Sequence, residues 1–335
     1  MEKTTTLAII GAGSWGTALS IVLEPRFEAI RLWTYEADLA ARIEATREND
    51  VYLRGLRVPQ KVDVMTDLAR ALAGADIVLG VMPSRYARSL YSAMLPHLDP
   101  SMIFVSATKG LETGTLLRIS EVIAQVVGQR FEPKVAVLSG PTFAREVARG
   151  EPAAVVIASA DPDTASSVQA AFAGPTFRLY TNQDTIGVEV GAALKNVIAI
   201  AAGVCHGLGL GNNTLAALIT RGLAEITRLA AAMGGQPRTL AGLAGLGDLV
   251  LTCSGDLSRN RMVGIELARG RRLADILGSM PMIAEGVETC DAAVALGQKF
   301  DVDLPIIHQM HAVLHLAKSP QAAVRDLMER SLKGE

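Results

Sequence analysis

One lysine lies in a strongly apolar segment, where a charged side chain calls for a structural or functional explanation. Lys195 lies in Gly191-Ala192-Ala193-Leu194-Lys195-Asn196, directly before the apolar run Val197–Val204. An ammonium group in such surroundings loses its hydration, which lowers its pKa toward neutrality and suits it to general acid–base chemistry. The alternative is a lysine that buries its methylene groups and extends its charge to solvent.

A carboxylate and a hydroxyl occur in a second apolar setting. Asp248 and Thr252 lie in the segment 242–253, which is otherwise made of glycine and apolar residues. An aspartate in such company is either a helix cap or a functional acid.

Two polar turns follow predicted strands. Lys109 lies just after the strand Met102–Ser106, and the turn Ser139–Ala144 follows the strand Val135–Leu138. Ligands of open parallel sheets lie beyond the carboxyl ends of the strands, so the two turns together indicate a site. Taken alone, Lys109 is equally typical of a surface charge at a helix start.

The first strand leads into a glycine-rich turn. Thr6–Ile10 is followed by Gly11-Ala12-Gly13-Ser14-Trp15-Gly16 and by a helix over Thr17–Leu23. In a strand–turn–helix unit these glycines permit a tight turn, close approach of a pyrophosphate and close packing of the helix on the strand. The pattern predicts a dinucleotide cofactor.

An acidic residue follows the second strand. Ala29–Trp33 ends at Tyr35-Glu36, and a carboxylate at this distance from the glycine turn accepts hydrogen bonds from the ribose hydroxyls of NAD. The same carboxylate would repel the 2′-phosphate of NADP. The alternative is a solvated charge that opens the next helix.

Strands and helices alternate as far as residue 182, after which the chain reads as helices joined by glycine-rich turns. We therefore expect an α/β protein with an N-terminal Rossmann-type doubly wound sheet in residues 1–182 and an all-α C-terminal domain in residues 183–335. The other predicted strands are 75–81, 153–158 and 177–180, and the other predicted helices of the first domain are 68–72, 88–95, 116–127 and 164–172.

Two features of the helical half are specific enough to test. A long apolar stripe, Leu215–Met233, predicts a core helix capped by Thr214, with Glu225 on the opposite face pairing with Arg221 and Arg228. Ser258-Arg259-Asn260 opens a further helix, where Ser258 is a plain cap or where the guanidinium and helix N-terminus bind a phosphate.

Composition limits the classes of function. The 335 residues carry a formal charge of −2, which argues against nonspecific nucleic-acid binding. The three cysteines are far apart and lack metal-ligand spacing, as expected for reduced thiols in a cytoplasmic protein with no metal. We expect no apolar segment long enough to span a membrane, hence no membrane insertion, and no targeting segment. The apolar helical half favours a homodimer.

Taken together, the motifs resemble those of NAD(P)-dependent glycerol-3-phosphate dehydrogenases, nearly from end to end. The resemblance rests on the turn 11–16, Ala107–Gly110, Ser139–Ala144, Ala193–Asn196, Gly207–Thr214, Gly245–Asp248 with Thr252, and Ser258–Asn260. It implies reversible reduction of dihydroxyacetone phosphate to sn-glycerol 3-phosphate, which supplies the glycerol backbone of phospholipids. Tyr35 departs from the pattern, since many bacterial members carry a basic residue there.

The resemblance also implies roles for individual residues. Lys195 is the expected general acid and base, with Lys109, Asp248 and Thr252 as its catalytic neighbours. The expected cofactor contacts are Gly11, Gly13, Ser14, Trp15, Gly16, Tyr35, Glu36, Lys109, Ala144, Arg259, Ile283 and Glu285. The expected substrate contacts are Lys109, Gly140, Thr142, Lys195, Asp248, Ser258, Arg259 and Asn260.

Two alternatives stay open, together with the choice of cofactor. A related 3-hydroxyacid dehydrogenase would use the same plan on a carboxylate substrate, since arginine binds both anions. A dinucleotide sensor without catalytic activity would leave Lys195, Lys109 and Asp248 without a purpose. Either NAD or NADP is expected, and Tyr35-Glu36 favours NAD.

Overall fold

Eight strands form a single sheet in the order β3-β2-β1-β4-β5-β6-β7-β8. In this computed structural model, which describes residues 6–280, 284–332 and 334, neighbouring strands are parallel except β6 and β7, which are antiparallel. The strands are β1 (Thr6–Ile10), β2 (Ala29–Trp33), β3 (Val62–Met65), β4 (Ile77–Gly80), β5 (Ile103–Ser106), β6 (Lys134–Ser139), β7 (Ala153–Ala158) and β8 (Phe177–Asn182).

Helices cover both faces of this sheet, which confirms the predicted doubly wound fold. They are α1 (Ser14–Leu23), α2 (Ala37–Thr46), α3 (Leu68–Leu72), α4 (Ala87–Met94), α5 (Ile119–Val127), α6 (Ala144–Ala148) and α7 (Pro162–Phe172). Successive residues of a strand point to opposite faces. Leu7 and Ile9 of β1 accordingly join the core under α1 and α7, whereas Ala8 and Ile10 join the core under α4 and α5.

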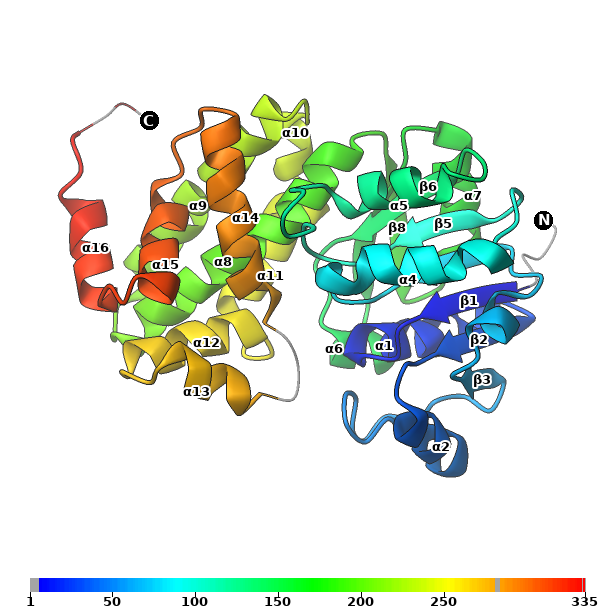
Figure 1. Ribbon diagram of the computed structural model, residues 1–335. Coiled ribbons are helices and arrows are strands. Elements are labelled where there is room, and N and C mark those ends of the chain that lie inside the picture. Colours follow the sequence, from blue (N-terminus) through cyan, green and yellow to red (C-terminus); the bar gives the residue numbers. More distant parts are fainter. Residues whose placement is uncertain (1–5, 281–283, 333, 335) are drawn as a thin grey trace.

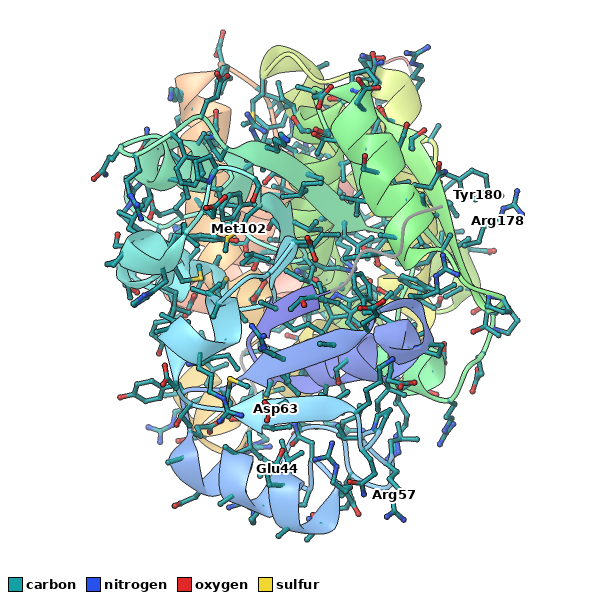
Figure 2. All side chains as sticks on the ribbon, turned by 90° about the vertical axis from the view of Figure 1, so that its right-hand side faces the viewer. Glu44, Arg57, Asp63, Met102, Arg178 and Tyr180 are labelled. Atoms are coloured by element: carbon teal, nitrogen blue, oxygen red, sulfur yellow. The ribbon has the colours of Figure 1, made fainter. Side chains whose placement is uncertain are left out.

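The sequence did not reveal β3. This strand has only four residues, and Asp63 interrupts its apolar pattern. It forms one edge of the sheet, where Val64 donates a backbone hydrogen bond to Glu44 of α2 (3.0 Å). Figure 2 shows Asp63 and Glu44 at this edge, with Arg178 and Tyr180 of β8 at the opposite side of the sheet. A short edge strand of this kind depends on its neighbours more than on its own residues.

The second half of the chain forms a separate helical lobe (Figure 1). Its helices are α8 (Thr185–Gly207), α9 (Asn212–Ala232), α10 (Pro237–Leu240), α11 (Asp248–Ser254), α12 (Arg259–Ala268), α13 (Leu273–Gly278), α14 (Glu285–Lys299), α15 (Pro305–His315) and α16 (Pro320–Met328). The predicted all-α second domain is confirmed. Helix α8 is its centre, since α9, α11, α12 and α14 all pack against it.

Helix α8 corrects the expectation that no apolar segment is long enough to span a membrane. It has 23 residues and a mean hydropathy of 1.6 in its most apolar window, so by length and composition it passes the test for a membrane span. That window is completely buried within the protein. A mostly apolar helix with no solvated face is what the centre of a helical lobe requires.

Helix α9 corrects two further expectations. It begins at Asn212 after Gly211, so Thr214 lies inside the first turn and does not cap it. Glu225 does not lie on a solvated face, because it is 1% exposed and accepts hydrogen bonds from the backbone N–H groups of Ile306 (2.7 Å) and Ile307 (3.3 Å). Glu225 therefore satisfies the first N–H groups of α15, a long-range contact that helical periodicity cannot show.

Candidate functional site

A single carboxylate lies between two ammonium groups at the junction of the lobes. Asp248 Oδ1 forms an ion pair with Lys195 Nζ, and Asp248 Oδ2 accepts from Lys109 Nζ at 2.9 Å. The Asp248 side chain is fully buried, and those of Lys195 and Lys109 are 5% and 18% exposed. Lys195 therefore does not extend to solvent, and Lys109 is not a surface charge.

Three separate elements supply these groups. Lys195 lies in the middle of α8, and Lys109 lies in the loop that follows β5. Asp248 is the first residue of α11, directly after a short π-helical turn at Leu243–Gly247. Its carboxylate pairs with the lysines and does not cap its own helix, so the functional alternative for Asp248 is the one that the geometry favours.

The surroundings of Lys195 shift its proton affinity. Burial lowers the pKa of Lys195 to about 7, and the positive charge of Lys109 acts in the same direction. The negative charge of Asp248 opposes this shift. The result is an ammonium group that gains and loses its proton near neutral pH.

Hydroxyl and carbonyl groups orient the two ammonium groups further. Lys195 Nζ donates to Thr252 Oγ1 (2.9 Å), and the Thr252 hydroxyl donates to the backbone carbonyl of Asp248 (2.6 Å). Lys109 Nζ donates to the carbonyl of Gly140 (3.3 Å), which also accepts from Thr142 Oγ1 (3.2 Å). The structure thus gathers Lys109, Lys195, Asp248, Thr252, Gly140 and Thr142 in one place.

Arg259 and Glu285 border this centre. The charges of Glu285 and Arg259 interact, and Glu285 also senses Lys109 and Lys195. Burial raises the pKa of Glu285 to about 7, which the charge of Arg259 opposes. Among the described residues, the Arg259 guanidinium makes no hydrogen bond and no ion pair within 4 Å. Within this part of the chain, its donors are therefore available to an anion.

The start of α12 serves partly to hold the helical lobe together. Ser258 Oγ accepts from the backbone N–H of Arg261 (3.3 Å), as a cap does. Asn260 Nδ2 donates to Asn196 Oδ1 (3.0 Å), while Asn260 Oδ1 accepts from the N–H of Gly286 (3.0 Å). Asn260 therefore joins α8, α12 and α14, and its contact on α8 is Asn196, the residue after Lys195.

The glycine-rich turn has the shape that a dinucleotide needs. A side chain at Gly16 would lie 1.9 Å from the Gly11 carbonyl oxygen, whereas a side chain at Gly13 would meet no protein atom within 4 Å. The N-cap of α1 is Gly13, which has no side chain with which to cap the helix. Its first N–H groups are thus available to a phosphate. In the described part of the chain, the buried Nε1 of Trp15 has no hydrogen-bond partner. These features fit a dinucleotide.

Three of the remaining predicted cofactor contacts, Tyr35, Glu36 and Ala144, lie near the sheet. Tyr35 is 87% exposed. Glu36 precedes α2 without capping it, and Glu36 Oε1 accepts from the hydroxyl of Tyr52 (2.9 Å). Ala144 is the first residue of α6. Ile283 lies outside the described residues.

Asn49 is a site residue that the sequence did not reveal. It is completely buried, and its Nδ2 donates to the Ala12 carbonyl (2.8 Å) and to Thr17 Oγ1 (2.8 Å). Asn49, which is distant from the glycine-rich turn in the sequence, therefore stabilises that turn by hydrogen bonds. Its surroundings in the sequence, Glu48-Asn49-Asp50, are typical of a solvated loop, so no local signal distinguishes it.

Two protein-family models match this chain, one over each of its two lobes. The N-terminal model of NAD-dependent glycerol-3-phosphate dehydrogenase matches residues 6–165, and the C-terminal model matches residues 184–325. A relative from Koribacter versatilis, named glycerol-3-phosphate dehydrogenase, NAD(P)+, is 59% identical over 97% of both chains. A relative of the same name from Geobacter sulfurreducens is 50% identical over 98% of both.

A solved structure is similar over almost the whole chain. The crystal structure of a glycerol-3-phosphate dehydrogenase from Coxiella burnetii has a TM-score of 0.93 and is 40% identical. The match covers 97% of this chain and 99% of that one. The similarity therefore includes both lobes and the junction between them.

Proposed function

The chain belongs to the family of NAD-dependent glycerol-3-phosphate dehydrogenases, and from this premise we propose that it reversibly reduces dihydroxyacetone phosphate to sn-glycerol 3-phosphate. It is an oxidoreductase that uses NAD or NADP. The observation that supports the proposal most is the buried Lys195–Asp248–Lys109 centre, which the guanidinium of Arg259 borders. The product supplies the glycerol backbone of phospholipids.

In the proposed reaction Lys195 gives a proton to the substrate carbonyl oxygen. An ammonium group has three N–H donors. Two of those on Lys195 are engaged by Asp248 and Thr252, which leaves one for the substrate. Because the pKa of Lys195 is about 7, the group can also take the proton back in the reverse direction.

Lys109 and Asp248 support this transfer. Lys109 engages Asp248 and the Gly140 carbonyl and keeps a third donor for the same carbonyl oxygen of the substrate. Asp248 orients both ammonium groups, and its negative charge limits the fall in the pKa of Lys195. A developing negative charge on the substrate oxygen thus meets two oriented donors in a largely buried site.

We place the substrate phosphate at the start of α12. Arg259 offers a guanidinium there that makes no hydrogen bond to the described residues, and the N-terminus of this ten-residue helix favours an anion. Ser258 and Asn260 flank it, although both side chains already make contacts within the protein. Glu285 lies close enough to Arg259 for their charges to interact.

The cofactor would be held along the carboxyl edge of the sheet. Residues 11–16 and the start of α1 suit the pyrophosphate, and a bound nicotinamide would supply the hydride. Glu36, oriented by Tyr52, suits the free ribose hydroxyls of NAD, which supports NADH as the preferred reductant. Tyr35 is exposed and available to stack on adenine.

Three broader features belong to the same proposal. The domain boundary lies at residue 182, because the last strand ends at Asn182 and α8 begins at Thr185. Residues 1–182 form the cofactor-binding domain, which also contributes Lys109 to the substrate site, and residues 183–335 form the substrate-binding domain. A cytoplasmic location is supported by the three cysteines, which are buried free thiols. A homodimer is supported by exposed apolar residues on the helical lobe, such as Val250 and Met262, and light scattering would test it.

A spectrophotometric assay tests the activity. Purified protein is mixed with NADH or NADPH and with dihydroxyacetone phosphate or a 3-oxo carboxylate of similar size. Oxidation of the reduced cofactor with the phosphate substrate alone is the expected result. Turnover confined to the carboxylate would identify a hydroxyacid dehydrogenase, and cofactor binding without turnover of either would identify a dinucleotide sensor.

A further inference from the structure

A second buried carboxylate connects the two lobes away from the substrate site. Glu189 lies on α8, N-terminal to Lys195, and is 4% exposed. It accepts from Arg118 Nη1 (2.7 Å), from the backbone N–H of Ser120 (2.8 Å) and from Ser120 Oγ (2.5 Å). No step of the proposed reaction uses this fully hydrogen-bonded group.

Its partners Arg118 and Ser120 lie at the end of the connection between β5 and α5, residues 107–118, which carries Lys109 and is called the Lys109 loop. Arg118 pairs with Leu111 as an isolated bridge across the neck of this loop, and the N–H of Glu112 donates to the Leu117 carbonyl (2.9 Å). Lys109 lies just before the neck. The position of Arg118 therefore helps to determine the path of the chain between β5 and α5, which includes Lys109.

Apolar contacts fix the same loop on the helical lobe. Leu111, although it follows β5 of the sheet lobe, is buried in the core formed by α8 and its neighbours, and Leu116 packs against that core. On the other side, Arg88 of α4 holds Glu112 with two hydrogen bonds of 2.8 Å. The loop is thus anchored to both lobes, and Glu189 is its charged anchor on α8.

We propose that Glu189 is a positioning residue: by holding Arg118 and Ser120 it sets the Lys109 ammonium against Asp248. The proposal rests on the proposed function, in which Lys109 and Lys195 act on one carbonyl oxygen. These two lysines come from different lobes, and both form an ion pair with Asp248. A rigid connection between α8 and the Lys109 loop keeps the donors aligned, and a misplacement of about 1 Å can lower a rate by 10²-fold.

Steady-state kinetics of Glu189→Gln test this directly. The amide has nearly the same shape, but it removes the charge that faces Arg118 and places an NH₂ group among donors. We expect kcat with dihydroxyacetone phosphate to fall by roughly 10- to 100-fold. The KM should change much less, because Arg259 and the α12 N-terminus stay in place.

The decisive measurement is the same substitution in a Lys109→Met background. If Glu189 acts by placing Lys109, Glu189→Gln should lower kcat no more than about twofold once Lys109 is absent. An equal loss in both backgrounds would mean that Glu189 acts on folding or on another group, and would overturn the proposal. So would a Glu189→Gln enzyme with the kcat of the unmodified protein.

Two further variants separate positioning from stability. Ser120→Ala removes one donor to Glu189 but keeps the backbone N–H, so we expect a smaller loss of kcat in a folded protein. Glu225→Gln alters another buried carboxylate of the same lobe, which contacts α15 instead of the Lys109 loop. It should lower the melting temperature and leave kcat unchanged.

The outcomes also distinguish this inference from the proposed function. If the unmodified protein does not reduce dihydroxyacetone phosphate, the proposed function fails and takes the inference with it. If the unmodified protein does reduce dihydroxyacetone phosphate, and the Ser120→Ala and Glu189→Gln variants reduce it with the same kcat, only the inference fails. Should Glu189→Gln not fold, the comparison of Ser120→Ala with and without Lys109 decides.

Discussion

The glycine-rich turn and the lysine–aspartate centre are built in opposite ways. The turn at residues 11–16 offers backbone N–H groups and three glycines without side chains, all from one continuous segment. The centre offers the side chains of Lys109, Lys195 and Asp248, which come from a loop and two helices far apart in the chain. One site binds by local backbone shape, and the other acts through charges brought together by the whole fold.

This difference determines how each site should respond to change. A backbone site fails when any side chain enters it, and the identity of that side chain matters little. A side-chain site fails when one functional group is removed, even if packing is kept. The following substitutions test this contrast.

Lys195→Ala should have the largest effect. We expect kcat to fall by about 10²- to 10⁴-fold, which is the usual contribution of a general acid or base. The protein should still fold and bind its cofactor, because the glycine-rich turn is separate. Steady-state kinetics and cofactor fluorescence measure both, and Lys195→Met controls for the lost volume. A near-normal kcat would remove Lys195 from the chemistry.

Arg259→Ala should act on binding of the substrate. A charge-assisted hydrogen bond contributes roughly 1.5 to 3 kcal/mol, so we expect KM for dihydroxyacetone phosphate to rise roughly 10- to 150-fold. Arg259→Lys, which keeps the charge but not the planar group, should lose less. An unchanged KM in the alanine variant would move the phosphate away from α12.

Two glycines of the same turn should respond differently. Gly16→Ala would place a methyl group 1.9 Å from the Gly11 carbonyl oxygen, and overpacking of this kind lowers the free energy of unfolding by about 1 to 3 kcal/mol. A methyl group at Gly13 meets no protein atom. The free energy of unfolding of Gly13→Ala should therefore stay within about 0.5 kcal/mol of that of the unmodified protein, while its affinity for the cofactor falls. Urea unfolding and cofactor titration together check this pair; equal destabilisation would contradict it.

The pH dependence of the two reaction directions should be opposite. Reduction needs the protonated Lys195, so its kcat should be high below the pKa of about 7 and fall about tenfold per pH unit above it, when chemistry limits the rate. Oxidation needs the neutral amine and should rise with pH to a plateau above about 7. Rates measured from pH 5.5 to 9 in both directions test this. Parallel profiles would argue against Lys195 as the titrating group.

Glu36→Ala should have the smallest effect, because it changes only the preference between cofactors. We expect the unmodified protein to prefer NADH. In the variant, the ratio of kcat/KM with NADH to kcat/KM with NADPH should fall toward one. Tyr52→Phe, which removes the hydrogen bond to Glu36, should narrow it less. Equal or better kcat/KM with NADPH in the unmodified protein would show that Glu36 does not face the ribose.

Much of the fold could be predicted because it is encoded locally. The runs of β1, β2 and β7 and the glycine turn after β1 are contiguous, so their residues show strand, turn and helix directly. The missed strand β3 has four residues and a charge in the middle. It is a strand because β2 pairs with it, and no local pattern shows that.

The sequence by itself determined which residues are out of place in their surroundings, namely Lys195 in an apolar helix and Asp248 among glycines and leucines. Glu189 shares that signal, as an acid in the same apolar helix, yet its role depends on Arg118. Only the tertiary structure decided that Glu225 faces the start of α15, that Glu189 meets the Lys109 loop and that one carboxylate joins two lysines. The reason is physical: burying a charge is unfavourable unless a partner compensates it, and a partner distant in the chain is supplied by packing.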